Sequence, residues 1–391
     1  MSGMDFLEKL LDGVAVEWLA LGDVAKYSDV RIDFNRVNKG SYVGVDNLLQ
    51  NRAGKTDSNY VPTEGRLIEY RPGDVLIGNI RPYLKKIWLA NQAGGTNGDV
   101  LVIRPIHMSL SSGYLHQVLT DENFFAYNMQ HAKGAKMPRG DKAKILEYRF
   151  PIPCPDNPQR SLEIQAEIVR ILDAFTELTA ELTAELTARK KQYKHYRDQL
   201  LSFEDEQVEW TTLGVVAEVN TGTKPPNILE SATSFDYINA GTSRSGYSAA
   251  SNCVGDTVTT PSRGQGGIGY VGYQREPFWL GPLCYKLQSI DKTVLINKYL
   301  FYFLQSRSDL LLGLKKEGGV PAVNKSDLVQ VEIPVPSLEE QKRIVFILDN
   351  FDTLTNSISE GLPREIELRQ KQYGYYRDLL LSFPKPEEVA A

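Results

Sequence analysis

The sequence contains an internal duplication. The stretch VEWLALGDVA at 16–25 returns as VEWTTLGVVA at 208–217, and RKKQYKHYRDQLLSF at 189–203 returns as RQKQYGYYRDLLLSF at 369–383. Each half therefore holds a variable block followed by a better-matched helical block. A tandem duplication of this kind predicts two copies of one fold, related by a pseudo-two-fold axis.

Looser matches place the boundaries of the repeat. GDVLIGNIR at 73–81 returns as GDTVTTPSR at 255–263, and PIPCP at 151–155 is echoed by IPVP at 333–336. We expect an N-terminal helical segment at 1–15, a first globular domain at 16–155, a central helix at 156–205, a second globular domain at 206–337, a C-terminal helix at 338–383 and a tail at 384–391. The opening FLEKLLDGVAVEW also resembles YRDQLLSFEDEQVEW at 196–210, so we expect the two chain ends to meet.

The globular blocks combine strand and helix patterns. GDVLIGNI and DVLVIRPI are β-branched runs bounded by Gly, Pro and Asp, which is typical of strands. Residues 111–130 and 296–314 place apolar side chains at helical spacing. Both blocks are therefore predicted to be α+β domains.

The helical blocks carry a heptad seam, which predicts pairing in a coiled coil. The first seam comprises Ile168, Leu172, Phe175, Thr179, Leu182, Leu186, Arg189, Tyr193, Tyr196, Leu200 and Phe203. The second comprises Ile344, Leu348, Phe351, Thr355, Ile358, Leu362, Ile366, Arg369, Tyr373, Tyr376, Leu380 and Phe383. Two consecutive steps of four interrupt the second seam near Gly361 and Pro363, where we expect a break or kink.

A literal tetrad repeat, LTAELTAELTA at 178–188, lies in the first helical block. Its candidate spacer residues are Thr179, Ala180, Glu181, Leu182, Thr183, Ala184, Glu185 and Leu186. Phe175 and Arg189 are 14 residues apart, whereas Phe351 and Arg369 are 18 apart, so the two spacers differ by one tetrad. A generic amphipathic helix explains the helicity but not the repetition.

Composition excludes several classes. No apolar run is long enough to span a bilayer, and the first residues lack the pattern of a signal peptide. Three scattered cysteines suggest neither a disulfide framework nor a zinc site, so we expect a cytoplasmic protein. The net charge is −5, but residues 16–150 carry 18 Lys and Arg against 14 Asp and Glu. A polyanion could face this relatively basic block.

No convincing catalytic constellation is present. GQGGIGYVG at 264–272 contains GxGxxG, but Pro277, Gly281 and Pro282 follow where a dinucleotide fold needs a helix. A P-loop is absent, and the four histidines show no metal spacing. Amino-methyltransferases carry a tetrapeptide of Asn or Asp, two prolines and an aromatic residue. The nearest match, KPPN at 224–227, has neither the acidic or amide first residue nor the aromatic last residue.

Basic and amide side chains in the globular blocks are the candidate DNA contacts. Arg reads guanine edges, Asn and Gln read adenine, and Lys mostly holds phosphates. The candidates are Arg31, Arg36, Lys39, Arg52, Lys55, Arg81, Lys85, Lys86, Lys133, Lys136 and Arg139 in the first block, with Lys224, Arg244, Arg263, Gln265, Lys315, Lys316 and Lys325 in the second. Any one of these is more often a solvated surface charge. Arg81 and Arg263 both lie eight residues after a GD pair, which suggests a shared role.

The duplication, the tetrads between ILDAF and RKKQY, and GLPREIELRQKQYGYYRDLLLSF together resemble the specificity (S) subunit of type I restriction–modification systems, in the branch with such spacer repeats. The resemblance covers nearly the whole chain. It implies two target-recognition domains held apart by antiparallel helices, with each domain reading one half of a split double-stranded DNA target.

The same resemblance implies partners but no chemistry in this chain. Two methyltransferase (M) subunits would bring S-adenosylmethionine and methylate adenine, and two restriction (R) subunits would bring ATP and Mg. No cofactor in this chain and no membrane are implied. Two alternatives stay open at this point: a self-sufficient DNA methyltransferase with divergent motifs, and a coiled-coil adaptor that does not bind nucleic acid.

Overall fold

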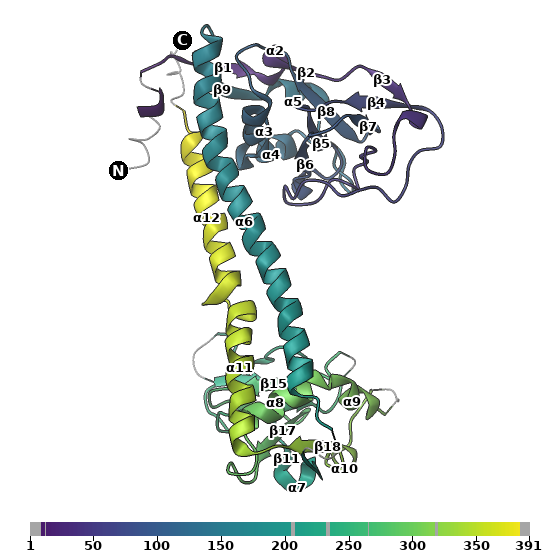
Figure 1. The fold of residues 1–391 in the computed structure, drawn as a ribbon, viewed down its shortest axis with the longest axis vertical. Coiled ribbons are helices and arrows are strands. Elements are labelled where there is room, and N and C mark those ends of the chain that lie inside the picture. Colours follow the sequence, from purple (N-terminus) through teal and green to yellow (C-terminus); the bar gives the residue numbers. More distant parts are fainter. Residues whose placement is uncertain are drawn as a thin grey trace. The chain divides into compact units, whose positions relative to one another are not determined.

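The computed structural model describes residues 9–11, 13–204, 208–231, 235–264, 266–316 and 320–383 (Figure 1). The chain divides into two compact units. Unit 1 comprises Met1–Glu181 and Ile366–Ala391, and unit 2 comprises Leu182–Glu365. Each unit contains one globular domain and two helical segments, and each is described by itself below.

The globular domain of unit 1 contains three antiparallel sheets. One sheet pairs β1 (Val16–Ala20) with β9 (Arg149–Pro153); the second has the order β2 (Ala25–Tyr27), β8 (Val100–Pro105), β5 (Val75–Gly78), β6 (Ile87–Leu89); the third has the order β3 (Arg31–Asp33), β4 (Arg66–Tyr70), β7 (Gly94–Thr96). The helices are α2 (Leu21–Val24), η1 (Phe34–Arg36), η2 (Pro82–Leu84), α3 (Ser112–Thr120), α4 (Glu122–Gln130) and α5 (Lys142–Glu147).

The domain of unit 2 repeats the two-stranded and the four-stranded sheet of this topology, whereas its three-stranded sheet differs in strand order and contains one parallel pair. Its sheets are β10 (Glu209–Thr212) with β18 (Glu332–Val335); β11 (Ala217–Thr221), β17 (Cys284–Ser289), β14 (Thr257–Pro261), β15 (Gly272–Gln274); and β13 (Gly246–Ser248), β12 (Phe235–Ile238), β16 (Trp279–Leu280). Its helices are α7 (Leu213–Val216), α8 (Asn297–Ser306), α9 (Ser308–Gly313) and α10 (Lys325–Leu328). The predicted duplication and the α+β class are confirmed.

The core of the first domain forms where the four-stranded sheet meets α3. All four residues of β5 are buried, as the continuous β-branched run predicted. Ser111 caps α3 by accepting a hydrogen bond from the Tyr114 amide at 3.2 Å. Tyr114 itself is fully buried, and its hydroxyl donates to the carbonyl of Pro151 on β9 at 2.8 Å. The helix is thereby fixed to the strand that leads out of the domain.

Both domains join their helical segments through the same buried contact. In unit 1 the side-chain oxygen of Gln165 accepts from the Ser111 amide at 2.8 Å, and in unit 2 that of Gln341 accepts from the Ile296 amide at 2.9 Å. Both glutamine side chains are fully buried. A satisfied buried amide fixes the start of each helix against its domain.

The first helical block is one uninterrupted helix, α6 (Pro158–Leu200), whereas the second consists of α11 (Leu338–Asn356) and α12 (Gly361–Leu380). In unit 1, Phe175 of α6 stacks on Tyr376 of α12 with ring centroids 5.2 Å apart. In unit 2, the ring centroids of Phe351 on α11 and Tyr196 on α6 are 5.7 Å apart. Figure 1 shows α6 and α12 side by side and antiparallel in unit 1. The predicted antiparallel helix pair is confirmed.

The break in the second block differs in detail from the prediction. Helix α11 ends at Asn356, and Gly361 opens α12 with a φ of +75°. A Cβ at residue 361 would lie 2.4 Å from the carbonyl oxygen of Thr353, so only glycine fits there. Pro363 lies in the first turn of α12, a position where proline is tolerated, and does not end a helix. Ile358, predicted in the seam, falls in the linker and is 85% exposed; that prediction was wrong.

Residues near both ends of the chain contribute to one core. Leu11, Leu380 and Phe383 belong to the same buried cluster of unit 1, in line with the expectation that the ends meet. No helix in the described part of the chain is both long enough and apolar enough to cross a membrane.

Candidate nucleic-acid interface

Three loops of the first domain meet at one place and carry most of its candidate cations. We call residues 49–56, 79–86 and 133–140 the loop cluster. The amide of Asn51 donates to the Leu84 carbonyl at 2.9 Å, and that of Arg52 donates to the Lys85 carbonyl at 2.9 Å. The Arg81 amide donates to the Pro138 carbonyl at 2.7 Å. These bonds join the three loops into one surface.

Backbone strain is concentrated in the same cluster. Asn51, Arg52, Arg81 and Lys85 adopt left-handed φ angles of 54°, 64°, 53° and 50°. Each such non-glycine residue costs of order 1–3 kcal/mol, and such residues concentrate at functional sites because the surrounding structure must hold them in place. The cluster is therefore a candidate functional surface on conformational grounds as well as on charge.

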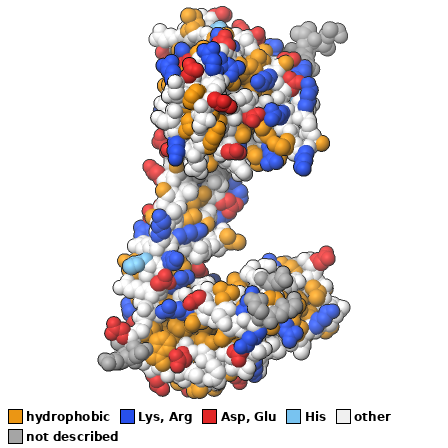
Figure 2. All heavy atoms as spheres, turned by 90° about the vertical axis from the view of Figure 1, so that its right-hand side faces the viewer, with side chains coloured by type: hydrophobic (Ala, Val, Ile, Leu, Met, Phe, Trp, Pro, Cys, Tyr) orange, Lys and Arg blue, Asp and Glu red, His pale blue; other side chains and the backbone are white. Residues whose placement is uncertain are grey.

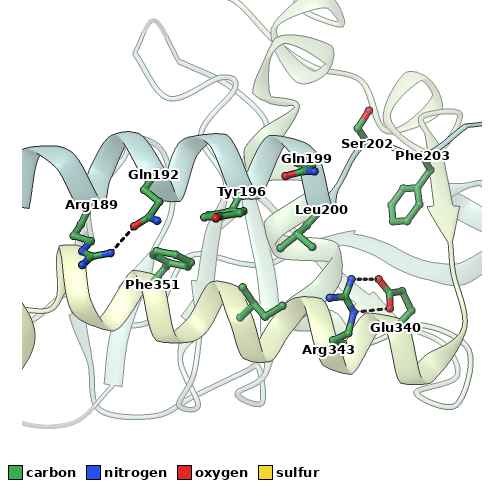
Figure 3. Close-up of a pocket in the computed structure, with 11 residues that line it drawn as sticks. Arg189, Gln192, Tyr196, Gln199, Leu200, Ser202, Phe203, Glu340, Arg343 and Phe351 are labelled. Carbon is green, nitrogen blue, oxygen red and sulfur yellow. Dashed lines mark hydrogen bonds and ion pairs between the residues drawn. The ribbon is translucent and has the colours of Figure 1, made fainter.

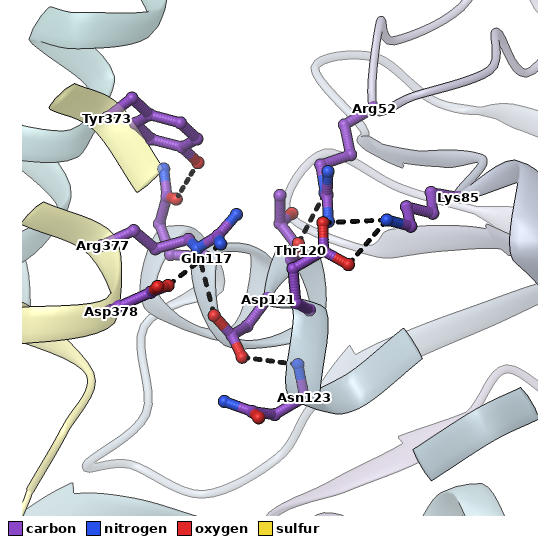
Figure 4. A network of polar contacts seen from close by, with 10 residues as sticks. Arg52, Lys85, Gln117, Thr120, Asp121, Asn123, Tyr373, Arg377 and Asp378 are labelled. Carbon is purple, nitrogen blue, oxygen red and sulfur yellow. Dashed lines mark hydrogen bonds and ion pairs between the residues drawn. The ribbon is translucent and has the colours of Figure 1, made fainter. Parts of the chain in front are cut away.

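Most cations of the cluster are engaged within the protein. Arg52 and Lys85 both pair with the Glu122 carboxylate, with a nitrogen–oxygen distance of 2.6 Å in each pair. Figure 4 shows the Arg52 and Lys85 side chains pointing toward the same carboxylate. The remaining engaged side chains are Lys55 with Asp57, Lys86 with the Val45 carbonyl, Lys133 with Asp141 and Arg139 with Asp99. Among the described residues, Arg81 and Lys136 make no side-chain hydrogen bond or ion pair, and both are exposed.

The three remaining candidates of the first domain lie outside the cluster. Arg31 is on β3, Arg36 ends η1, and Lys39 is in the loop that follows. All three are exposed and have no ion pair with the described part of the chain. The loop that contains Lys39 is joined to the cluster through Gly40, whose carbonyl accepts a hydrogen bond from Lys55 at 2.7 Å.

Glu122 is the residue that sequence reasoning missed. Burial alone would raise its pKa, but hydrogen bonds from Lys85 and Arg52 outweigh this effect and lower the pKa to about 2. The only sequence signal is its place directly after Asp121, which caps α4. Tyr83, 49% exposed within the cluster, was also missed because only basic and amide side chains were considered.

Acid should therefore weaken this part of unit 1. A carboxyl whose pKa is depressed on folding stabilises the folded state above its unfolded value, near 4.5, and this contribution is lost as the pH falls toward about 2. We expect the wild-type chain to lose more stability between about pH 5 and pH 3 than Glu122→Gln does, as measured by urea unfolding. Glu147→Gln, which removes a surface pair with Lys144, is the matched control and should follow the wild type. Parallel pH profiles for Glu122→Gln and the wild type would contradict the prediction.

The second domain also engages most of its candidates. Arg244 pairs with Asp236 at 2.9 Å, Lys316 with Asp327 at 3.2 Å, and Lys325 donates to Asn220 at 3.1 Å. Lys315 is half-buried and has a partner as well. Lys224 and Arg263 are exposed and have no side-chain partner among the described residues. Gln265 lies outside the residues that the structure describes.

The structure corrects the expected equivalence of Arg81 and Arg263. In the first domain the backbone of Ile80 forms an isolated β-bridge with that of Arg139, whereas in the second domain Arg263 itself forms the β-bridge, with Ala322. The Gly264 amide donates to the Pro321 carbonyl at 3.1 Å, as the Arg81 amide does to Pro138. Arg263 therefore takes the place of Ile80, and Gly264 takes that of Arg81. The cause is one extra residue, Thr257, between the GD pair and the strand residue Val258, which aligns with Val75.

Charge on the visible face is mixed. Figure 2 shows Lys and Arg side chains interspersed with acidic and apolar side chains on both units, with no continuous basic surface. This distribution agrees with the internal ion pairs. It favours a few defined cationic contacts in each domain over a uniformly basic patch.

Unit 2 has a hollow between α6 and α11, of about 730 Å³. Figure 3 shows Tyr196, Leu200 and Phe351 facing this hollow, with an ion pair between Arg343 and Glu340 at 2.7 Å on its rim. Within the described ranges, no group of three or more His, Cys, Asp and Glu side chains is placed to hold a metal ion. The hollow presents an apolar floor with a charged rim, which suits a packed protein segment.

Two copies of an α+β domain on antiparallel helices, with cationic loops in each, define a two-domain recognition scaffold. The fold is similar to the crystal structure of the S subunit of a type I restriction–modification system from M. genitalium, with a TM-score of 0.60, 16% identity, and coverage of 96% of this chain and 98% of that one. At this identity the likeness concerns the fold alone.

Sequence comparison supplies the family. The model of the "Type I restriction modification DNA specificity domain" matches residues 206–368. The type I restriction enzyme EcoR124I/EcoR124II specificity subunit of Escherichia coli is 38% identical over 428 residues and covers both chains completely. The EcoprrI specificity subunit of Escherichia coli is 31% identical, covering 92% of this chain and 93% of that one. The chain therefore belongs to the family of type I restriction–modification specificity subunits.

Membership in this family decides between the functional classes left open by the sequence. The family's role is DNA specificity, not catalysis, and the matches extend over the whole chain. A self-sufficient methyltransferase and a coiled-coil adaptor without a DNA role are therefore not favoured.

Proposed function

We propose that each globular domain reads one half of a bipartite double-stranded DNA target and that the helical pair sets the unread gap between the halves. The observation that carries this proposal is the repetition of one domain, anchored twice through equivalent buried glutamines, Gln165 and Gln341. Two tethered readers discriminate better than one, provided that their spacing is rigid. The domain boundaries at 16–155 and 206–337 belong to the same proposal.

The partners follow from the class of system. Two M subunits bind the helical blocks, supply S-adenosylmethionine and methylate an adenine in each half-target, while two R subunits supply ATP- and Mg-dependent cleavage. This chain directs both activities by sequence recognition in the cytoplasm. The apolar hollow lined by Tyr196 and Phe351 offers one place where a partner helix could pack.

The internal ion pairs narrow the set of DNA contacts. Nine candidates are engaged in ion pairs or hydrogen bonds within the chain: Arg52, Lys55, Lys85, Lys86, Lys133, Arg139, Arg244, Lys316 and Lys325. Arg31, Arg36, Lys39, Arg81, Lys136, Lys224 and Arg263 are the cations we expect to meet phosphates or bases. Gln265 keeps its proposed role as a candidate base contact in the second domain.

The test is to map methylated adenines in cells that carry this chain with its M partner. We expect methylation at one bipartite motif, with two defined half-sequences separated by a fixed gap. The M partner without this chain should give no such motif. A single continuous motif, or binding of S-adenosylmethionine by this chain alone, would contradict the proposal.

A further inference from the structure

One turn of the loop cluster is fixed in a shape that an arginine rarely adopts. The chain leaves β5 at Gly78, turns left-handed at Arg81, passes through η2 and turns left-handed again at Lys85. The Leu84 amide donates to the Arg81 carbonyl at 2.9 Å, and the Asn51 amide donates to the Leu84 carbonyl at 2.9 Å. Hydrogen bonds from two other loops thus hold this turn before any ligand arrives.

The charges around the turn isolate one guanidinium. Lys85 and Arg52 share Glu122, Lys86 is bound to a backbone carbonyl, and Lys133 and Arg139 have acidic partners. Within the described cluster, only Arg81 and Lys136 keep a charge without such a partner, and Arg81 is the only arginine of the two. A guanidinium can bind the O6 and N7 atoms of guanine bidentately, whereas an ammonium acts as a point charge on phosphate.

We propose that Arg81 reads a guanine in the half-target of the first domain and that the left-handed turn presents it to the base edge. The inference rests on the proposed function of the chain. Fixing the backbone before binding reduces the ordering cost of the contact, which sharpens discrimination between bases. Neutralised neighbours add little uniform attraction to phosphate, so sequence-specific contacts account for a larger share of binding.

The contact belongs to the first domain alone. Gly264, with a φ of +123°, occupies the place of Arg81 in the second domain and offers no side chain. The two domains therefore read their half-targets with different groups at this position. Glycine is therefore a suitable substitution for Arg81, because it adopts a left-handed φ without strain.

The experiment maps methylated adenines for the full chain with its M partner in four forms: wild type, Arg81→Gly, Arg81→Lys and Lys136→Ala. In Arg81→Gly we expect one G·C position of one half-target to accept other bases, with discrimination reduced about 5- to 150-fold (about 1–3 kcal/mol per bidentate pair). The other half-target and the gap should be unchanged. Arg81→Lys should relax the same position, whereas Lys136→Ala should lower methylation at all sites without changing the motif.

Three results would overturn the inference. In the first, Arg81→Gly leaves the motif intact and only lowers methylation everywhere, which assigns Arg81 to phosphate. In the second, Arg81→Lys discriminates between bases as well as the wild type does, which shows that the positive charge is sufficient and the guanidinium is not required. In the third, the affected half-target contains no G·C pair. Failure of the proposed function is distinguishable, because the wild type would then give no bipartite motif.

Discussion

Deletion of Thr179–Leu182 is expected to change the gap between the two half-targets by one or two base pairs while leaving both half-sequences intact. The tetrads lie inside α6, which runs without interruption from Pro158 to Leu200. One tetrad contributes roughly 6 Å of rise and about 40° of net rotation, and DNA advances about 3.4 Å per base pair. The boundary between the two compact units falls within the tetrads, between Glu181 and Leu182.

The matched control keeps the length and changes the chemistry. Ala180, Glu181 and Ala184 are exposed, so Ala180→Gln, Glu181→Lys and Ala184→Gln together alter the surface without touching the seam residues Leu182 and Leu186. Adenine methylation mapped in cells should show the wild-type gap for this triple variant. An unchanged gap after the deletion, a shifted gap in the triple variant, or complete loss of methylation after the deletion would each contradict the length hypothesis.

Arg377→Met is expected to destabilise unit 1 by about 3–5 kcal/mol, because it leaves a carboxylate buried without its counter-charge. The Nε atom of Arg377 lies 3.0 Å from an Asp121 carboxylate oxygen, and both side chains are only 6% exposed. Figure 4 shows this pair joining α12 to the start of α4, where Asp121 also accepts a hydrogen bond from the Asn123 amide. Methionine keeps an apolar side chain against Tyr373 and removes the guanidinium charge together with its contacts to Asp378 and the Tyr373 ring.

Arg197→Met is the matched control, since Arg197 occupies the same place in RKKQYKHYRDQLLSF as Arg377 does in RQKQYGYYRDLLLSF. It lies over Tyr193 as Arg377 lies over Tyr373, but it pairs only with its neighbour Asp198, which is 49% exposed. We expect a cost below about 1 kcal/mol for this variant.

Native-state hydrogen exchange of the full chain measures each unit separately: the amides of α4 and α12 report on Arg377→Met in unit 1, and the amides of α8 and α11 report on Arg197→Met in unit 2. Asp121→Asn added to Arg377→Met should restore part of the loss, because asparagine keeps the capping acceptor without the charge. Equal effects of Arg377→Met and Arg197→Met would show that the buried pair is not what stabilises this junction.

The fold could be predicted to the extent that the repeat made it visible. Literal matches such as VEWLALGDVA and VEWTTLGVVA, together with heptad spacing, indicated both domains and the helical pair. Local detail failed where one residue was added or a helix ended. Thr257 displaced Arg263 from its expected place, and the end of α11 left Ile358 exposed in a linker.

The candidate site was less accessible to sequence reasoning because its charges are neutralised over long sequence distances. Arg52 and Glu122 are 70 residues apart. Arg139 and Asp99, which also form an ion pair, are likewise distant in the sequence. A count of basic residues treats engaged and free cations alike. The left-handed backbone of Arg81 has no signature in the sequence either, since arginine is not a residue that favours it.

The pairing of the first and last strands of each domain has a consequence for how specificity can diverge. Val16 lies opposite Pro153 in one domain, and Glu209 lies opposite Val335 in the other, so the chain enters and leaves each domain at a single point. The distance between the entry point and the exit point is set by the hydrogen bonds between these two strands, and it does not depend on the residues that form the rest of the domain. Loops inside the domain can therefore lengthen, shorten or change sequence without moving the origin of the helix that follows. A family built in this way can diversify what it reads while the frame that carries the readers stays constant.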